Sequence, residues 1–268
     1  MSANGFAFTQ PPLDSVMPQH AQDNCFAVCA GGAVLLVAWG IYLALSRRSW
    51  LPIVILIAAQ CSFLLEGPAD VMSNALYPPV GQDVAHVVKG HTIAWFVVPV
   101  YIWYVGLLPL CMYDAFVKQT VPYSAWGKIA LATLIGVATV EQIPVNFGLW
   151  MYYGVQPLKI GLMPLWLIAA NVACVIVPAV MIYRLIPVFT GWKQLLFIPF
   201  VPASCAMGHA GAGIVMYNIL GGDTENMPLW ILYAGTLATV VLTAVVCWVF
   251  VAWTYGRLPT GITQSPAL

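Results

Sequence analysis

The sequence has very few charged residues. Lys, Arg, Asp and Glu make up 7% of its 268 residues, whereas 62% are hydrophobic and the mean hydropathy is +0.89. A soluble domain carries about a quarter charged residues, so this chain cannot cover a surface that faces water. An all-α integral membrane protein is expected, because backbone in lipid must satisfy its own hydrogen bonds. The formal net charge of zero leaves no basic surface for nucleic acid.

Several kinds of site are missing too. The seven Cys include no CxxC pair, which argues against a zinc site and a disulfide framework. The four His, at His20, His86, His91 and His209, are too few and too scattered for a membrane di-iron centre. No Gly-rich phosphate loop, dinucleotide fingerprint or paired Asp-rich motif occurs, and the last apolar run has no Lys for a retinal Schiff base. No metal and no cofactor are expected.

What the sequence does contain is seven apolar runs near the roughly 20 residues that a membrane span needs. Residues 1–24 are polar, lack the pattern of a signal peptide and are expected to form an extramembrane tail. Residues 25–255 should form the transmembrane bundle, and residues 256–268 a second tail. The seven predicted spans are Cys25–Ser46, Trp50–Glu66, Thr92–Phe116, Ser124–Pro144, Leu162–Phe189, Leu195–Leu220 and Pro228–Tyr255.

The positions of Lys and Arg predict the orientation in the membrane. Seven of the nine basic residues flank the links between spans one and two, three and four, and five and six, or follow span seven. Only Lys89 and Lys159 lie on the other side. The N-terminus is therefore predicted outside and the C-terminus in the cytoplasm. On the cytoplasmic side, Asp114 is expected to pair with Lys118 at helical spacing.

Two polar stretches interrupt the apolar pattern on the predicted outer side. They are Glu66–Gln82 (EGPADVMSNALYPPVGQ) and Glu141–Asn171 (EQIPVNFGLWMYYGVQPLKIGLMPLWLIAAN). We expect them to lie together and to roof a polar pocket in the bundle. The connection Gly67–His91 is rich in Pro and Gly, which predicts a structured or partly re-entrant loop.

Glu66 and Glu141 are the predicted catalytic pair. Each is expected near the C-terminal end of a span, just before Pro68 or Pro144, where the helix should end or kink. The helix dipole and the hydrocarbon both favour a neutral carboxyl there, which is the form that a general acid needs. The alternative is that both are solvated caps at the interface. Asp70 is a supporting catalytic candidate, or else an ordinary loop carboxylate.

His209 is the fourth catalytic candidate. It follows Gly208 beside a face of small residues that repeats every four positions, Ser204, Gly208 and Ala212, which predicts close helix packing. His209 is either a proton carrier or a neutral histidine that bonds a neighbouring helix. The candidates for binding substrate are Asn146, Tyr153, Asn171, Asn218 and Trp95. Interhelical hydrogen bonds and the aromatic belt are the alternative roles for these side chains.

The two polar stretches, with HTIAWFVVPVYIWYVG between them, resemble the AveC-like spirocyclase family of actinobacterial membrane proteins. The likeness covers roughly Glu66 to Asn171 and is a pattern of Glu, Pro, Gly and aromatic residues in order. It implies an enzyme of secondary metabolism in the bacterial plasma membrane. Such an enzyme closes a spiroketal in a lipophilic dihydroxy-ketone by cofactor-free acid–base catalysis and also influences dehydration. Its partners would be this small molecule and membrane lipids.

Two other functions fit the same sequence. The size and the predicted seven-span layout are similar to those of fungal integral-membrane terpene cyclases, which start their reaction by protonation. That function requires an aromatic, nearly polar-free pocket with one acid at its end. A transporter or binding protein for lipid or small solutes is the non-enzymatic alternative, and it requires an opening on both faces.

Overall fold

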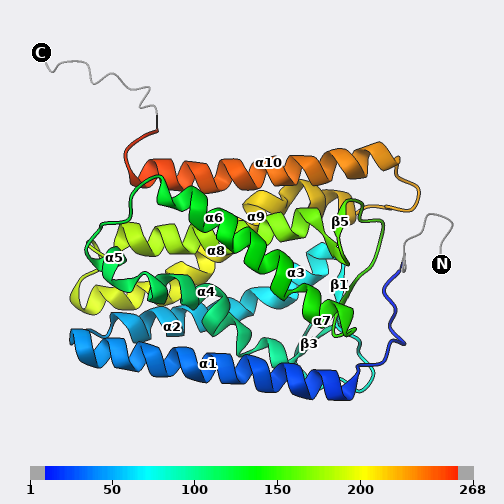
Figure 1. Ribbon diagram of the computed structural model, residues 1–268. Coiled ribbons are helices and arrows are strands. Elements are labelled where there is room, and N and C mark those ends of the chain that lie inside the picture. The colour runs from blue at the N-terminus through cyan, green and yellow to red at the C-terminus, as the bar shows by residue number, and fades with distance from the viewer. Residues whose placement is uncertain (1–9, 259–268) are drawn as a thin grey trace, which may run out of the picture.

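The computed structural model of the protein describes residues 10–258. Helices run side by side along one axis, and short strands gather at one end of them (Figure 1). The α-helices are α1 (Gln19–Arg47), α2 (Leu51–Cys61), α3 (Glu66–Ser73), α4 (Val100–Cys111), α5 (Tyr113–Val117), α6 (Ala125–Val140), α7 (Gln142–Asn146), α8 (Leu165–Leu185), α9 (Phe197–Leu220) and α10 (Leu229–Thr254). Three 3-10 segments, η1 (Ser62–Leu65), η2 (Trp95–Val97) and η3 (Gly191–Leu196), adjoin them.

Six helical segments within residues 10–258 are long and apolar enough to cross a membrane. This confirms a helical, multi-pass architecture. The six are Gln19–Arg47, Leu51–Ser73, Ala125–Asn146, Leu165–Leu185, Gly191–Leu220 and Leu229–Thr254. The predicted N-terminal tail ends earlier than expected, since its last residues already belong to α1. The outer parts of both predicted tails, residues 1–9 and 259–268, lie outside the described residues.

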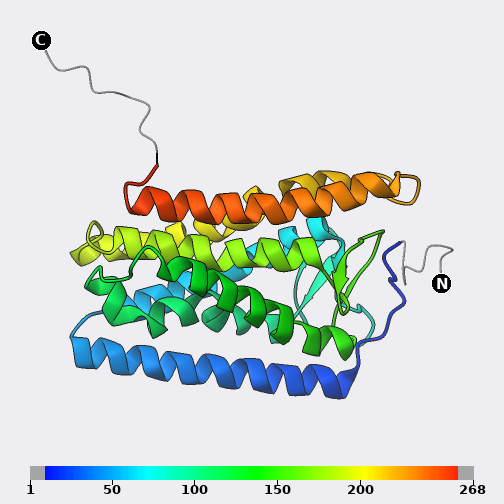
Figure 2. The ribbon, with the colours of Figure 1, turned by 45° about the horizontal axis from the view of Figure 1, so that its top comes forward.

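The third predicted span, Thr92–Phe116, is not one continuous helix. Its start forms a strand, its apolar helical part is the shorter segment Trp95–Cys111, and α5 follows as a separate turn of helix. Pro109 lies inside α4 and removes one backbone hydrogen bond. Met112 then leaves the helical conformation between α4 and α5. This segment still runs beside the six longer helices (Figure 2).

The second predicted span continues past Glu66. The chain tightens into η1 and resumes as α3, so the spanning segment ends at Ser73 and not at Glu66. Pro68 is tolerated because it lies in the first turn of α3, where its missing N–H has no partner to lose. The connection Gly67–His91 is structured, one of the two forms expected: its first part is helical, and its last part is a β-hairpin.

Three two-stranded antiparallel sheets close the end of the bundle where α1 begins. β2 (Val84–Val88) pairs with β3 (His91–Ala94), and β5 (Lys159–Ile160) pairs with β6 (Met163–Pro164). β1 (Ala75–Leu76) pairs with β4 (Met151–Tyr152), so Ala75 lies opposite Tyr152. This last sheet joins the two polar stretches and confirms that they lie together.

The centre of the bundle is α8. Sixteen of its 21 residues are buried, and it packs against α4, α6, α9 and α10. Its contact with α9 depends on the predicted small-residue face, because Ser204, Gly208 and Ala212 are all buried. A Cβ atom at Gly208 would lie 2.5 Å from the carbonyl oxygen of Ala173. The two helices therefore meet closely, as the sequence pattern predicts.

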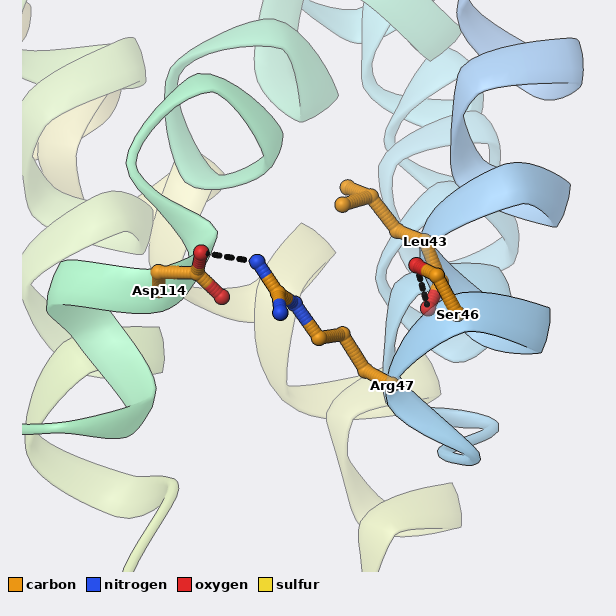
Figure 3. Close-up of polar contacts among 4 residues, drawn as sticks. All are labelled: Leu43, Ser46, Arg47 and Asp114. Atoms are coloured by element: carbon orange, nitrogen blue, oxygen red, sulfur yellow. Dashed lines mark hydrogen bonds and ion pairs between the residues drawn. The ribbon is translucent and has the colours of Figure 1, made fainter.

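The opposite end of the bundle carries an ion pair between α1 and α5. Figure 3 shows the Arg47 guanidinium pointing at the Asp114 carboxylate, to which it donates. The predicted pairing of Asp114 with Lys118 is therefore wrong. Asp114 lies in the first turn of the short α5, facing the last turn of α1, whereas Lys118 follows as the C-cap. About half of each side chain in the pair is exposed, with relative areas of 52% and 47%.

Candidate functional site

Glu66 lies inside the bundle, where η1 passes into α3, and two tyrosines hold it. The hydroxyl of Tyr101, on α4, donates to Oε2 at 2.5 Å. The hydroxyl of Tyr77, just after β1, donates to Oε1. Both tyrosines are buried. Each carboxyl oxygen therefore has a hydroxyl partner, and the Glu66 side chain is partly buried.

Tyr77 remains a proton donor in this setting. Burial, followed by the neighbouring carboxyl groups of Glu66 and Asp70, raises the pKa of Tyr77 well above its ordinary value. The phenol therefore keeps its proton at neutral pH, because the phenolate would be poorly solvated and close to negative charge. Its ring packs edge-on against Phe96 and Trp150, with centroids 5.7 and 5.8 Å away.

Glu141 lies at the second helix break, between α6 and α7, and starts a chain of hydrogen bonds across three helices. The side-chain amide of Asn171, on α8, donates to Oε1 of Glu141 at 2.9 Å. Oδ1 of Asn171 is 3.0 Å from Nε2 of His209, on α9. Nδ1 of His209 is 2.5 Å from the hydroxyl oxygen of Tyr217, two turns further along α9. Two predicted catalytic residues and one predicted binding residue thus meet in one chain.

The two carboxyl sites are joined by a pair of tyrosines on α4. The rings of Tyr101 and Tyr104 pack edge to face with centroids 5.9 Å apart. Tyr101 bonds Glu66, while the Tyr104 hydroxyl donates to the backbone oxygen of Asn171 at 3.3 Å. Glu66 and Glu141, 75 positions apart in the printed sequence, therefore belong to one connected cluster of polar groups that are buried or partly buried.

Asp70 is also buried, with 8% of its surface exposed, so the loop alternative is wrong. It follows Glu66 by one turn of α3, which puts both on one helix face. Its Oδ2 is buried and has no hydrogen-bond partner among the described residues. The pKa of Tyr152, at the β1–β4 sheet, is raised well above its ordinary value by burial and by the charges of Glu141, Asp70 and Glu66.

A buried glutamine closes the cluster on the side of the strands. Gln156 is fully buried and accepts a hydrogen bond from the indole nitrogen of Trp166 at 3.0 Å. Its amide nitrogen donates to the backbone oxygens of Tyr153 and Ser73, at 2.7 and 3.1 Å. The Trp166 ring packs edge-on against Tyr217. The loop after β4 is thereby fixed to α3, α8 and α9.

Four of the predicted binding residues are not part of this hydrogen-bonded cluster. Asn146 and Asn218 are exposed and donate to carbonyl oxygens of their own helices, four residues back. Trp95 is half exposed. Tyr153 is partly buried and reaches the cluster through its backbone oxygen, not through its hydroxyl. Asn171 belongs to the cluster, and its contacts with Glu141 and His209 are interhelical hydrogen bonds, the alternative role for this side chain.

The polar partners that sequence reasoning missed are mostly aromatic. They are Tyr77, Tyr101, Tyr104, Gln156 and Tyr217. Tyr217 had a usable signal, because it follows His209 by eight residues and so lies on the same helical face. The others had none in the sequence, because the break at η1 and the β1–β4 pairing decide where they point.

The two best-defined cavities among the described residues lie away from the cluster. One, of about 470 Å³, is between the start of α1 and the β2–β3 hairpin, and Trp95 is one of its lining residues. The other, of about 330 Å³, is at the opposite end, beside Arg47 and Asp114. Neither has Glu66 or Glu141 in its lining, so neither cavity is the polar pocket that was expected beneath the two polar stretches.

The cluster consists of carboxyl, hydroxyl, amide and imidazole groups. Within residues 10–258, no group of three or more His, Cys, Asp or Glu side chains is arranged to hold a metal ion. Buried carboxyls held by neutral donors are able to exchange protons with a bound molecule. Comparison of the chain with protein families, with curated proteins and with solved structures found no match.

Proposed function

We propose that this chain is an integral-membrane enzyme that cyclises or dehydrates a lipophilic substrate by cofactor-free acid–base catalysis. The observation that carries the proposal is the connected cluster of Glu66 and Glu141 at two helix breaks, inside the bundle and held by neutral donors. Ionisable residues within membrane segments are costly to bury and are usually functional. Irregular backbone at this depth is tolerated where it is covered by protein or lines a cavity.

Spiroketal closure matches the groups available. Glu66, with Tyr77 and Tyr101 as hydroxyl partners, gives a proton to the ketone oxygen while a substrate hydroxyl attacks the carbonyl carbon. The resulting hydroxyl leaves as water, and an oxocarbenium ion forms. A second substrate hydroxyl then closes the other ring. Glu141 stabilises the positive charge and receives the released proton. The overall change is a dihydroxy-ketone converted to a spiroketal and one water.

The polar character of the cluster separates this function from the alternatives. A terpene cyclase needs one acid and a nearly polar-free aromatic wall, whereas this cluster contains hydroxyl, amide and imidazole groups from three helices, α4, α8 and α9. A transporter needs polar access from both faces. The Arg47–Asp114 pair, at the other end of the bundle, is an exposed contact and does not continue the cluster. Recognition of hydroxyl and carbonyl groups is the better match.

The finer topology belongs to the same proposal. Trp95–Val117 completes a seventh crossing, with the strands outside and the Arg47–Asp114 end in the cytoplasm of a bacterium, because most Lys and Arg lie at that end. The substrate then enters the outer half of the bundle sideways from the lipid, which suits a hydrophobic molecule.

The test is product analysis in a host that expresses the protein with the genes that surround its own. Glu66→Gln and Glu141→Gln should each reduce product formation at least a hundredfold, within the range that acid–base groups contribute. Glu225→Gln is the matched control, because Glu225 is exposed and remote in the chain from both breaks. Full turnover by both Glu66→Gln and Glu141→Gln, with all variants inserted equally, would refute the proposal.

A further inference from the structure

We infer that Tyr217 and His209 form a proton-accepting unit and that Asn171 fixes the tautomer of the His209 ring. Within this unit, Tyr217 is the residue of α9 that receives a proton from substrate. The catalytic part rests on the acid–base function proposed above. The assignment of the His209 tautomer does not rest on that function, because it follows from which atoms donate hydrogen bonds and which atoms accept them.

The assignment of the tautomer starts at Glu141. Its Oε1 accepts from the amide nitrogen of Asn171, so the other amide atom, Oδ1, is the one that faces His209. An amide oxygen only accepts, and the ring proton of His209 must therefore lie on Nε2. Nδ1 is left with a lone pair, and the Tyr217 hydroxyl donates to it. Asn171 thus selects the histidine tautomer in which Nδ1 is a base.

Asn171 positions the ring but does not pass protons on. Its nitrogen is already a donor to Glu141 and its oxygen an acceptor from His209, and a neutral amide has no further site that exchanges protons readily. A proton that reaches His209 is therefore not passed on through Asn171 to Glu141. Glu141, on the far side of the amide, holds Asn171 in this orientation through the hydrogen bond that its Oε1 accepts.

The local geometry of α9 favours the contact between His209 and Tyr217. Gly213 lies halfway between His209 and Tyr217, and a Cβ atom there would come within 2.9 Å of the Tyr217 ring. The ring therefore folds back over the space that the glycine leaves, toward His209. The edge of Trp166 packs against the Tyr217 ring, with centroids 5.6 Å apart. Any side chain larger than hydrogen at Gly213 displaces the hydroxyl from Nδ1.

The unit can take one proton from a substrate hydroxyl. The substrate O–H bond breaks and its proton goes to the oxygen of Tyr217. The O–H bond of Tyr217 breaks in turn, and its proton forms the Nδ1–H bond of an imidazolium. The substrate oxygen uses the freed electron pair to form the ring C–O bond. The proton on His209 returns by the same path when the leaving hydroxyl departs as water. Glu66 is then the acid, Tyr217–His209 accepts the proton of the first substrate hydroxyl, and Glu141 accepts that of the second.

The experiment is nitrogen-15 NMR of the full chain, labelled at histidine and held in detergent micelles. His209→Gln identifies the His209 signals among the four histidines. We expect a neutral ring with its proton on Nε2. Tyr217→Phe should keep this tautomer while it shifts the Nδ1 resonance, and Gly213→Ala should shift Nδ1 in the same direction. Asn171→Ala should move the proton to Nδ1, wholly or in part.

The control is Asn218→Ala, which removes an exposed amide from the same helix and should leave all His209 signals unchanged. Asn171→Asp is the second variant in case Asn171→Ala does not fold, and it should hold the proton on Nε2 because its carboxylate only accepts. The inference would be overturned if the His209 ring of the unchanged protein carried its proton on Nδ1, or if Asn171→Ala left the His209 tautomer unchanged. Loss of activity in Glu66→Gln with a normal His209 tautomer separates the two proposals.

Discussion

At the scale of residues, the carboxyls of this protein are held without basic side chains. Glu66 has two tyrosine hydroxyls, and Glu141 has the amide of Asn171. Among the described residues, the one ion pair is at the other end of the bundle. Neutral donors satisfy a buried carboxyl and leave its proton exchangeable, whereas a buried Lys or Arg would fix it as the anion. The donors are therefore as important to the site as the acids.

The tyrosine hydroxyls should be needed for stability as well as for chemistry. Tyr101→Phe leaves one buried oxygen of Glu66 without a donor, which should cost about 1–3 kcal/mol of unfolding free energy. Reversible unfolding in mixed micelles measures this. Tyr42→Phe, an exposed tyrosine on α1, is the control and should change the free energy by less than about 0.5 kcal/mol. An equal effect of both substitutions would contradict the assigned hydrogen bond.

In contrast to the tyrosine hydroxyls, the Asp70 carboxyl should not stabilise the folded protein. Its Oδ2 is buried without a partner, so ionisation of this carboxyl is unfavourable in the folded state. Asp70→Asn removes the ionisable group at nearly constant shape and should keep or raise the melting temperature, while it lowers product formation at least tenfold. Such a trade of stability against activity is typical of functional groups. A clear drop in melting temperature would show instead that Asp70 supports the fold.

At the scale of elements, two broken helices and one close helix pair build the site. The breaks at η1 and between α6 and α7 bring Glu66 and Glu141 inward. The close contact of α8 with α9 brings Asn171 to His209. The sequence predicted the apolar runs, the small-residue face and the pairing of the two polar stretches. It did not predict that the second span resumes after Glu66, because Pro68 stops a helix in most positions but is harmless in a first turn.

The α8–α9 contact can be tested with two glycines. Gly208→Ala puts a Cβ against the backbone of Ala173, so the helices must separate, and we expect a loss of about 1–3 kcal/mol. Gly136→Ala, within α6, meets nothing within 4 Å and should be neutral or stabilise by up to about 1 kcal/mol. Thermal unfolding in one detergent compares them. Equal melting temperatures would argue against close packing at Gly208.

The ion pair between α1 and α5 should contribute little. Both side chains are about half exposed, and exposed pairs contribute about 0–1 kcal/mol. A double-mutant cycle with Arg47→Met and Asp114→Asn should give a coupling free energy in that range, and it should shrink further as salt is raised. A coupling above about 2 kcal/mol would mean that the pair is buried in the membrane-bound protein.

At the scale of the whole molecule, the two ends of the bundle differ. One end carries the strands (Figure 1), and the other carries the Arg47–Asp114 pair. α1 begins and α10 ends at opposite ends. The orientation of these two ends in the membrane, which Lys and Arg predict, stays a prediction. The cluster itself could not be predicted, because it depends on which faces of α4, α8 and α9 turn toward one another.

The division predicts which loops are accessible from each side of the membrane. In a background without the seven native cysteines, Lys89→Cys should react with an impermeant maleimide in intact cells. Lys118→Cys should react only after the membrane is opened. Expression as judged by a C-terminal tag controls for insertion. The reverse pattern of labelling would invert the proposed topology and place the cluster in the inner half of the bundle.

The β1–β4 sheet also has a consequence for how the protein is made. Residues 75–76 leave the ribosome long before their partners at 151–152, and the four α-helices α4 to α7 are synthesised between them. The loop that carries Tyr77 therefore waits without its strand partner while α4 and α6 enter the membrane. Contacts that are distant in sequence form late. A nascent chain arrested before Met151 contains both Glu66 and Glu141 but lacks the β4 strand that joins the two polar stretches. The site is therefore completed only in the second half of translation.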